Sequence, residues 1–171
     1  MLDNFSIDKF KSKKPPKDNS LKTLSEIKKL EKTPIDKAFV ENNDEVEDRF
    51  NDIVSDDSIE TLINQSVPHI VKLKKYFNRP RPKDLAKNFG IKLDNIELKS
   101  MNTASYPSGH SVQAYLIADQ LKQKYPEKSK DLDKVADDIS NSRKIARAHY
   151  ESDSKFGKTI GLEMSKHIKE Q

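Results

Sequence analysis

The sequence predicts an all-α protein that folds as a single helical bundle. Apolar residues recur at intervals of three and four in several segments, which is the pattern of amphipathic helices. No segment alternates apolar and polar residues convincingly, so β-strands are not expected. The length of 171 residues favours one domain. Only 33% of residues are hydrophobic and 35% are charged, so we expect a solvated tail or narrow amphipathic helices in part of the chain.

Charge and composition exclude several classes of protein. The 32 lysines and arginines are mixed with 28 acidic residues, which argues against a dedicated nucleic-acid surface. The absence of cysteine excludes disulfides, thiolate metal sites and thiol nucleophiles. No apolar run reaches the roughly 18 residues that span a bilayer, and no signal peptide is visible at the N-terminus. We therefore expect a protein that is cytoplasmic or otherwise soluble.

The first half of the chain divides into a tail and a series of short helices. Residues 1–19 are polar, rich in lysine and contain two prolines, so they predict a flexible tail before a helical domain over 20–171. Ser20 is a suitable N-cap for a helix that Pro34 would end. Its apolar positions are Leu21, Leu24, Ile27 and Leu30. A second helix would carry Val46, Phe50, Ile53 and Val54.

The second half predicts longer helices around an internal loop. A third helix is expected over about 57–66, and Pro68 suits the first turn of a new helix that ends near Phe77. Residues 78–107 contain three prolines and little periodicity, which predicts a loop. Three further helices are expected over 109–125, 130–148 and 154–169.

Three motifs in fixed order point to a function. The first is KKYFNRPRP, in which Lys74 and Arg81 fit the spacing K-x6-R-P. The second is Pro107-Ser108-Gly109-His110, and the third is Ser142-Arg143, five residues, His149, three residues and Asp153. Together they resemble the signature of the type 2 phosphatidic acid phosphatase superfamily, which includes class A nonspecific acid phosphatases and vanadium haloperoxidases. The resemblance covers about residues 70–155 and implies a helical bundle of that type.

The motif residues suit phosphate chemistry on physical grounds. Phosphoryl transfer spreads negative charge over three oxygens, so it needs positioning and cations. No metal-binding motif is present, and Lys74, Arg81 and Arg143 can supply the cations. Ser108 can cap a helix whose first N–H groups, such as that of Gly109, would point at the anion. The sequence thus predicts phosphate binding without a metal or cofactor.

The resemblance also implies catalytic roles. His149 would attack phosphorus and become phosphohistidine, His110 would protonate the leaving group, and water would attack in the second step. His149 and Asp153 are four residues apart, so on a helix they would share a face. The Asp153 carboxylate could then fix the imidazole tautomer. The expected substrate is a small phosphate ester, and the oligomeric state stays open.

Helical phase leaves two questions about the motifs. Lys74 lies on the same helical face as the apolar residues around it, whereas Lys72, which with Arg79 also fits K-x6-R-P, lies off that face. We therefore favour Lys74 and Arg81. Arg143 and His149 are six residues apart, about 120° on an unbroken helix. Either the arginine reaches around the helix or the helix breaks near Ala148.

Two other functions fit the same residues. A vanadate-dependent haloperoxidase would hold vanadate in the anion pocket, and a catalytically silent module would keep the fold without the reaction. The sequence lacks the membrane helices of the lipid-phosphatase branch and the export signal of the secreted acid phosphatases, so substrate and location stay open. His69 and His167 match no motif.

Overall fold

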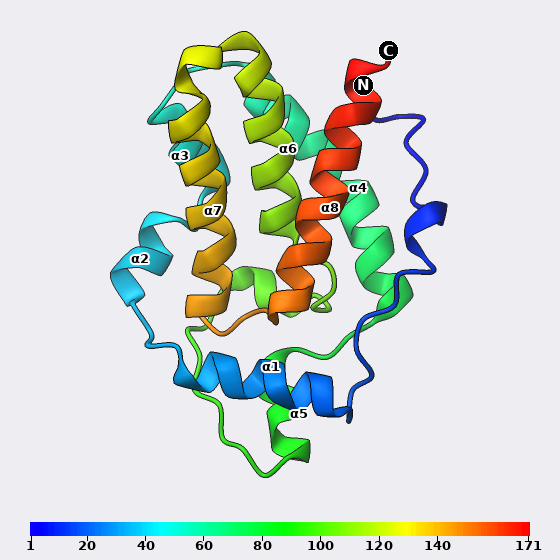
Figure 1. The fold of residues 1–171 in the computed structure, drawn as a ribbon, viewed down its shortest axis with the longest axis vertical. Coiled ribbons are helices and arrows are strands. Elements are labelled where there is room, and N and C mark those ends of the chain that lie inside the picture. Colours follow the sequence, from blue (N-terminus) through cyan, green and yellow to red (C-terminus); the bar gives the residue numbers. More distant parts are fainter.

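The computed structural model describes residues 1–171 and contains helices and no strands (Figure 1). The all-α prediction is confirmed. The helices, in chain order, are α1 (Leu21–Lys32), α2 (Lys37–Asn42), α3 (Val46–Asn51), α4 (Ser58–Phe77), α5 (Pro82–Asn88), α6 (Gly109–Lys124), α7 (Ser129–Ile145) and α8 (Glu151–Lys169). Short 3₁₀ turns cover Asp8–Phe10, Lys99–Asn102 and Pro126–Lys128.

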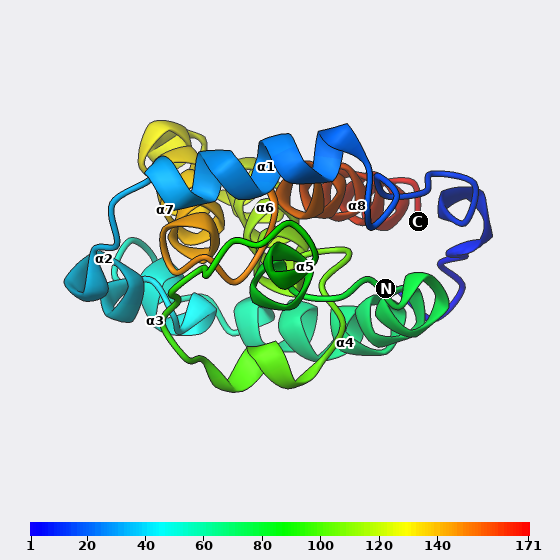
Figure 2. The same ribbon diagram turned by 90° about the horizontal axis from the view of Figure 1, so that it is seen from below.

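The long helices α4, α6, α7 and α8 form the body of the molecule (Figure 1). Helix α6 is central and packs against the other three. Helix α1 lies across the lower ends of α7 and α8, with α5 beneath it, as the view from below shows (Figure 2). The main core fills the space between the long helices, and its apolar side chains include Leu73, Ile117, Ile139 and Ile160.

Helices α6 and α8 approach closely because α8 carries two glycines at the contact. A Cβ atom on Gly157 would lie 2.7 Å from the Ser108 carbonyl oxygen, and one on Gly161 would lie 2.4 Å from the Val112 carbonyl oxygen. Both distances are shorter than van der Waals contact. Glycine thus brings the start of α8 against the start of α6, where the Pro-Ser-Gly-His motif lies.

Helix α4 differs from the prediction that Pro68 begins a new helix, and that prediction is wrong. Residues 58–77 form one helix with Pro68 in its interior. A proline there loses one backbone hydrogen bond and costs about 3 kcal/mol. The buried face continues on both sides of it through Leu62, Ser66 and Ile70, and this burial outweighs the local preference.

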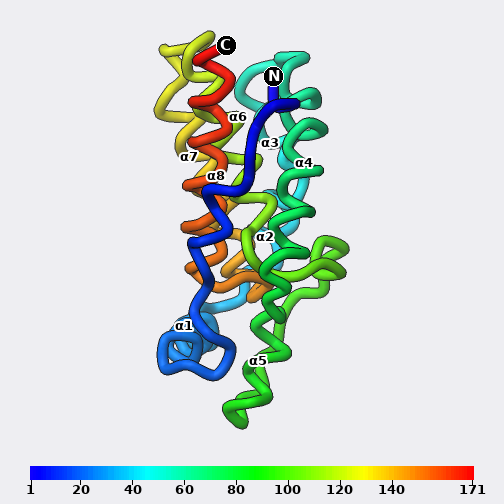
Figure 3. The backbone as a smooth tube through the Cα atoms, turned by 90° about the vertical axis from the view of Figure 1, so that its right-hand side faces the viewer, coloured from blue at the N-terminus to red at the C-terminus, as the bar shows by residue number.

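The N-terminal segment also differs from the solvated tail that its composition predicts. Leu2, Phe5 and Phe10 are buried in the main core. Figure 3 shows the segment running along the side of the bundle past α8. The Leu2 carbonyl lies 3.0 Å from His69 Nε2, and the Tyr106 hydroxyl donates to the Lys13 carbonyl at 2.8 Å. These three apolar residues are spread among charged ones, so no local pattern reveals their burial.

Smaller differences concern element ends. The expected helix over 130–148 ends at Ile145, the helix expected at 154 begins at Glu151, and the predicted loop over 78–107 contains α5. Helix α2 was outside the predicted elements and covers only six residues. The Ser20 cap is confirmed, since its hydroxyl accepts a hydrogen bond from the Thr23 N–H.

Candidate active site

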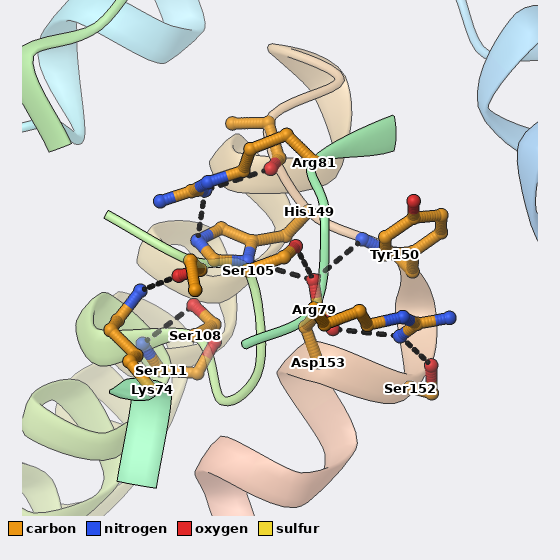
Figure 4. A network of polar contacts seen from close by, with 12 residues as sticks. Lys74, Arg79, Arg81, Ser105, Ser108, Ser111, His149, Tyr150, Ser152 and Asp153 are labelled. Carbon is orange, nitrogen blue, oxygen red and sulfur yellow. Dashed lines mark hydrogen bonds and ion pairs between the residues drawn. The ribbon is translucent and has the colours of Figure 1, made fainter. Parts of the chain in front are cut away.

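The motif residues come from separate elements that meet at the lower end of the bundle. Lys74 is in the last turn of α4, Arg81 precedes α5, Ser108 to His110 begin α6, and Arg143 is near the end of α7. His149 and Asp153 flank the start of α8. Figure 4 shows Lys74, Arg81, Ser108, His149 and Asp153 in one network of polar contacts. The cluster is largely buried.

The Pro-Ser-Gly-His motif forms the first turn of α6. Ser108 is the N-cap, and its hydroxyl accepts a hydrogen bond from the Ser111 N–H. The Ser108 N–H in turn donates to the Asp153 carbonyl at 3.1 Å. Gly109 packs on α4, where an added Cβ would lie 3.3 Å from Ile70 Cγ2 and 3.8 Å from Lys74 Cε. The glycine therefore lets the start of α6 pack closely against Ile70 of α4, in the turn before Lys74.

The chain breaks between α7 and α8, which is one of the two arrangements that the Arg143–His149 spacing allows. Helix α7 ends at Ile145, and Arg147 has a left-handed φ of 59°. His149 then precedes Tyr150, the N-cap of α8, and Asp153 is the third helical residue. His149 and Asp153 therefore do not share a helix face. They meet because Asp153 caps α8, where its Oδ2 accepts the Tyr150 N–H at 3.1 Å.

Hydrogen bonds fix the tautomer of His149. Its Nε2 lies 2.9 Å from Arg81 Nη1, and because a guanidinium can only donate, Nε2 is the acceptor. The hydrogen is then on Nδ1, which donates to Asp153 Oδ2 at 2.9 Å. Burial lowers the pKa of His149 well below its usual value, and the charges of Arg81 and Lys74 act in the same direction. The imidazole is therefore neutral, with a lone pair on Nε2.

The Asp153 carboxylate is fully buried and accepts several hydrogen bonds. Besides His149 and the Tyr150 N–H, its donors are Arg79 Nη1 at 2.8 Å and the Ser105 hydroxyl. Burial raises the pKa of Asp153 to about 6, while the Arg79 charge and the hydrogen bonds from Ser105, Arg79 and Tyr150 oppose that rise. The carboxylate is thus ionised near neutrality beside the imidazole.

Three cationic side chains lie around His149. Lys74 Nζ donates to the Ala104 carbonyl at 2.8 Å, and burial lowers its pKa to about 7. Arg81 donates to the Ser100, Thr103 and Ala148 carbonyls as well as to His149, and burial lowers its pKa to about 10. Burial also lowers the pKa of Arg143. Cations packed this closely repel one another, so the site favours an anion.

His110 faces a neighbouring residue that the motifs do not contain. Its Nε2 lies 2.8 Å from the Asp44 carbonyl oxygen, to which it can only donate. The Asp44 carboxylate pairs with Arg143 Nη1 at 2.9 Å. Burial, reinforced by the Arg143 charge, lowers the pKa of His110 to about 4. His110 also lines a pocket of about 310 Å³ together with Asp44, Glu45, Lys99 and Gln113.

Comparison with known proteins gives two similar sequences. The chain is 34% identical over 88 residues to a non-specific acid phosphatase of Salmonella typhi and 33% identical over 88 residues to one of Salmonella typhimurium. Each match covers 52% of this chain and 35% of the relative. The chain thus spans about a third of the length of the curated relatives it matches. No family model matches the chain.

Two further findings concern the whole chain. None of its helices combines the length and the apolar composition needed to cross a membrane. No group of three or more histidine, aspartate or glutamate side chains is arranged to hold a metal ion. His69 and His167 each pack edge-on against the Phe5 ring.

The two lysines that fit the spacing of the first motif lie in different surroundings, and two acidic residues near the site were not indicated by the sequence. Lys72 is exposed, whereas Lys74 is buried in the cluster. Arg79, the alternative arginine, contacts Asp153 rather than His149. Asp44 and Glu26 carry no sequence signal, because each is one of many acids in a polar segment. A search for acids near the motifs would have missed both, since they precede the first motif by many residues.

Proposed function

We propose that this protein is a phosphatase that hydrolyses small phosphate monoesters through a phosphohistidine at His149. One observation carries the proposal. His149 has an unprotonated Nε2 that faces a cluster of cations, while its Nδ1–H is held by the buried carboxylate of Asp153. A nucleophile and its orienting acid in hydrogen-bond contact are the general arrangement for covalent catalysis. The acid phosphatase relatives support the same reaction class.

In the first step, Lys74, Arg81 and Arg143 would bind the phosphate oxygens, together with the free N–H groups at the start of α6. Arg81 now donates to His149 Nε2, and transfer of that donor to a phosphate oxygen would free the lone pair. Nε2 then attacks phosphorus, and the bond from phosphorus to the ester oxygen breaks. The imidazole becomes positive, and the Asp153 carboxylate stabilises that charge.

His110 would supply the proton that the leaving oxygen needs. Its pKa of about 4 makes it neutral near pH 7 without substrate. A phosphate dianion beside it favours the charged form and raises that pKa, because opposite charges attract. After departure of the alcohol, His110 would take a proton from water as the water attacks phosphorus. The bond from phosphorus to Nε2 then breaks, which releases phosphate and restores neutral His149.

The same cluster of cations suits vanadate, so a vanadate-dependent haloperoxidase and a silent binding module are the alternatives. The relatives are named as acid phosphatases, and this favours hydrolysis over both. The His149–Asp153 contact also weighs against a silent module, because a module that only binds anions has no use for an oriented nucleophile.

The test is hydrolysis by two histidine variants on two substrates. His149→Ala should abolish phosphoenzyme formation and lower turnover by several orders of magnitude. His110→Ala should retain p-nitrophenyl phosphate activity and lose about 10²–10⁴-fold on an alkyl phosphate, whose leaving group needs the proton. His69→Ala is the matched control, since His69 hydrogen-bonds to the Leu2 carbonyl and packs against Phe5, neither of which belongs to a motif.

Rapid quench with labelled substrate identifies the intermediate directly. Label on the protein in His149→Ala would refute the assigned nucleophile. An equal fractional loss on both substrates in His110→Ala would refute its role as the acid. Bromide oxidation with vanadate and peroxide, in the absence of phosphate hydrolysis, would favour the haloperoxidase instead.

A further inference from the structure

A second buried ionic contact lies behind Asp153, on the side away from His149. Arg79 precedes α5, and its side chain has 0% exposure. Its Nη1 donates to Asp153 Oδ1 at 2.8 Å and to the Ser152 hydroxyl oxygen at 2.8 Å. Figure 4 shows Arg79 on the Tyr150 and Ser152 side of Asp153, with Arg81 on the His149 side. The two arginines of the first motif thus have different partners.

Helix α1 fixes Arg79 from below. Glu26, on the buried face of α1, pairs with Arg79 Nη2 at 3.3 Å, and its side chain is 2% exposed. Glu26 also accepts the Ser152 N–H at 2.8 Å and the Ser152 hydroxyl at 2.9 Å. These contacts attach α1 to the first turn of α8, where α1 crosses beneath it (Figure 2). The helix therefore holds both Arg79 and the backbone next to Asp153.

The surroundings leave Arg79 little freedom to move. Its guanidinium carbon lies 3.7 Å from the centroid of the Tyr150 ring, which is a close cation–π contact. The Arg79 carbonyl oxygen accepts the Ser105 N–H at 2.8 Å, and the Ser105 hydroxyl donates to Asp153. Arg79 thus orders the carboxylate through one contact of its own and through Ser105. A planar guanidinium suits this site because it can bond three acceptors at once.

Charge explains why Asp153 needs a cation on this side. Burial alone favours the protonated carboxyl, and the Arg79 charge is the largest influence that opposes it. Other ionisable groups that act on Asp153 include His149, Lys74, Arg81, Tyr106 and Tyr150, and the Glu26 carboxylate binds the same guanidinium. Lys74 and Arg81 lie on the His149 side and would be engaged by phosphate. The two tyrosines are neutral, since burial raises the pKa of each.

We propose that Arg79, anchored by Glu26 of α1, is a positioning residue that holds the Asp153 carboxylate ionised and aimed at His149 Nδ1. The inference rests on the proposed function, in which His149 is the nucleophile and Asp153 stabilises its positive form. Arg79 touches neither the substrate nor the reacting nitrogen, so it acts through Asp153. Loss of the Arg79 side chain therefore slows the chemical step and shifts the pH dependence of turnover, whereas phosphate binding changes less.

The experiment compares Arg79→Gln and Arg79→Lys with wild type. Turnover and KM are measured against pH, and the Asp153 carboxyl is titrated by ¹³C NMR. Asp153 is ionised above its pKa of about 6, so activity that needs the carboxylate falls as pH drops through that value. Removal of the cation in Arg79→Gln should raise the pKa by about 1–3 units, which moves the acidic limb to higher pH. Turnover should fall by up to about 100-fold, as for a misplaced catalytic group.

Arg79→Lys keeps the charge but loses the planar fork. It should leave the acidic limb near that of wild type and still lower turnover. Lys124→Gln is the matched control, because Lys124 pairs with the largely buried Asp56 at the far end of α6. That variant removes a cation from a carboxylate in the same way, and it should lower stability without any change in the pH profile.

The outcomes separate the inference from the proposed function. An unshifted acidic limb and an unshifted ¹³C titration in Arg79→Gln would overturn the inference, and so would full turnover in Arg79→Lys. If Arg79→Gln does not fold, the turnover of Arg79→Lys tests the inference by itself: lowered turnover supports it and full turnover overturns it. Retained hydrolysis in His149→Ala would refute the proposed function instead. The ¹³C titration needs no activity, so it still tests the hold of Arg79 on Asp153 in that case.

Discussion

The two glycines of α8 allow a prediction about how the packing of α8 against α6 positions the residues at the start of α6. A Cβ on Gly157 would lie 2.7 Å from the Ser108 carbonyl oxygen and 2.8 Å from Ser111 Cβ. A Cβ on Gly161 would lie 2.4 Å from the Val112 carbonyl oxygen and 3.1 Å from the Leu116 nitrogen. Restoring ordinary contact requires α6 and α8 to separate by about 0.7 Å in Gly157→Ala and about 1 Å in Gly161→Ala.

The effect on stability is the difference between two opposing changes. Overpacking costs about 1–3 kcal/mol, while alanine in a helix interior gains about 1 kcal/mol over glycine. The net loss in Gly157→Ala is then about 0–2 kcal/mol, which lowers Tm by at most about 8 °C for a chain of this size. Gly161→Ala lies at the upper end of that range, because its contact with backbone is tighter.

The effect on activity should follow the opposite order. Gly157 packs directly against Ser108, the N-cap beside Gly109, whereas Gly161 packs one turn further from the site. A displacement of about 1 Å in a catalytic group can cost about 100-fold in rate. We expect Gly157→Ala to lose about 10–100-fold in kcat/KM and Gly161→Ala to lose less activity but more stability.

The assay combines thermal unfolding with p-nitrophenyl phosphate kinetics on both variants. Wild-type kcat/KM in Gly157→Ala would refute the view that this contact positions the start of α6. A larger loss of activity in Gly161→Ala than in Gly157→Ala would refute it as well.

Four further predictions concern anions, metals and pH. Inorganic phosphate should stabilise the fold, since it relieves repulsion among Lys74, Arg81 and Arg143. At a phosphate concentration 100 times the Kd, the free energy of unfolding rises by about 2.7 kcal/mol, which is measured as a rise in Tm. An unchanged Tm would count against an anion site. Vanadate should inhibit competitively, because it resembles the transition state. Hydrolysis should survive EDTA, and loss of activity that a divalent ion restores would refute a mechanism based on side-chain cations. Stability should fall as pH drops from about 6.5 towards 4, because His110, with a folded pKa of about 4, gains its proton mainly on unfolding. Protonation of Asp153 changes stability with pH in the opposite direction, so the effect of His110 is isolated by comparing wild type with His110→Gln. The Tm of that variant should fall less over this pH range. An identical slope of Tm against pH in both proteins would contradict the lowered pKa of His110.

Features with a local cause could be predicted from the sequence. Helical spacing predicted the all-α class, and side-chain chemistry predicted the Ser20 cap, which accepts the Thr23 N–H. Ser108 likewise caps α6 within its own turn. The three motifs indicated which side chains could bind phosphate, because cations and histidines at fixed spacing are visible in a linear chain.

Local preference gave the wrong result where long-range packing was stronger. Pro68 favours a helix start, yet the apolar face of α4 continues through it. Leu2, Phe5 and Phe10 belong to a polar segment, yet the core covers them. In both cases the burial depends on surfaces from distant parts of the chain, which local composition does not describe.

The sequence by itself determined the helical class of this protein and the residue types available for phosphate chemistry. Only the tertiary structure decided their surroundings. Arg79 meets Asp153 across 74 residues, Asp44 meets Arg143 across 99, and Glu26 meets Ser152 across 126. Such contacts stabilise the fold because a buried charge without a hydrogen-bonded partner is energetically costly. No spacing rule encodes that partner, since it depends on how α1, α7 and α8 pack together.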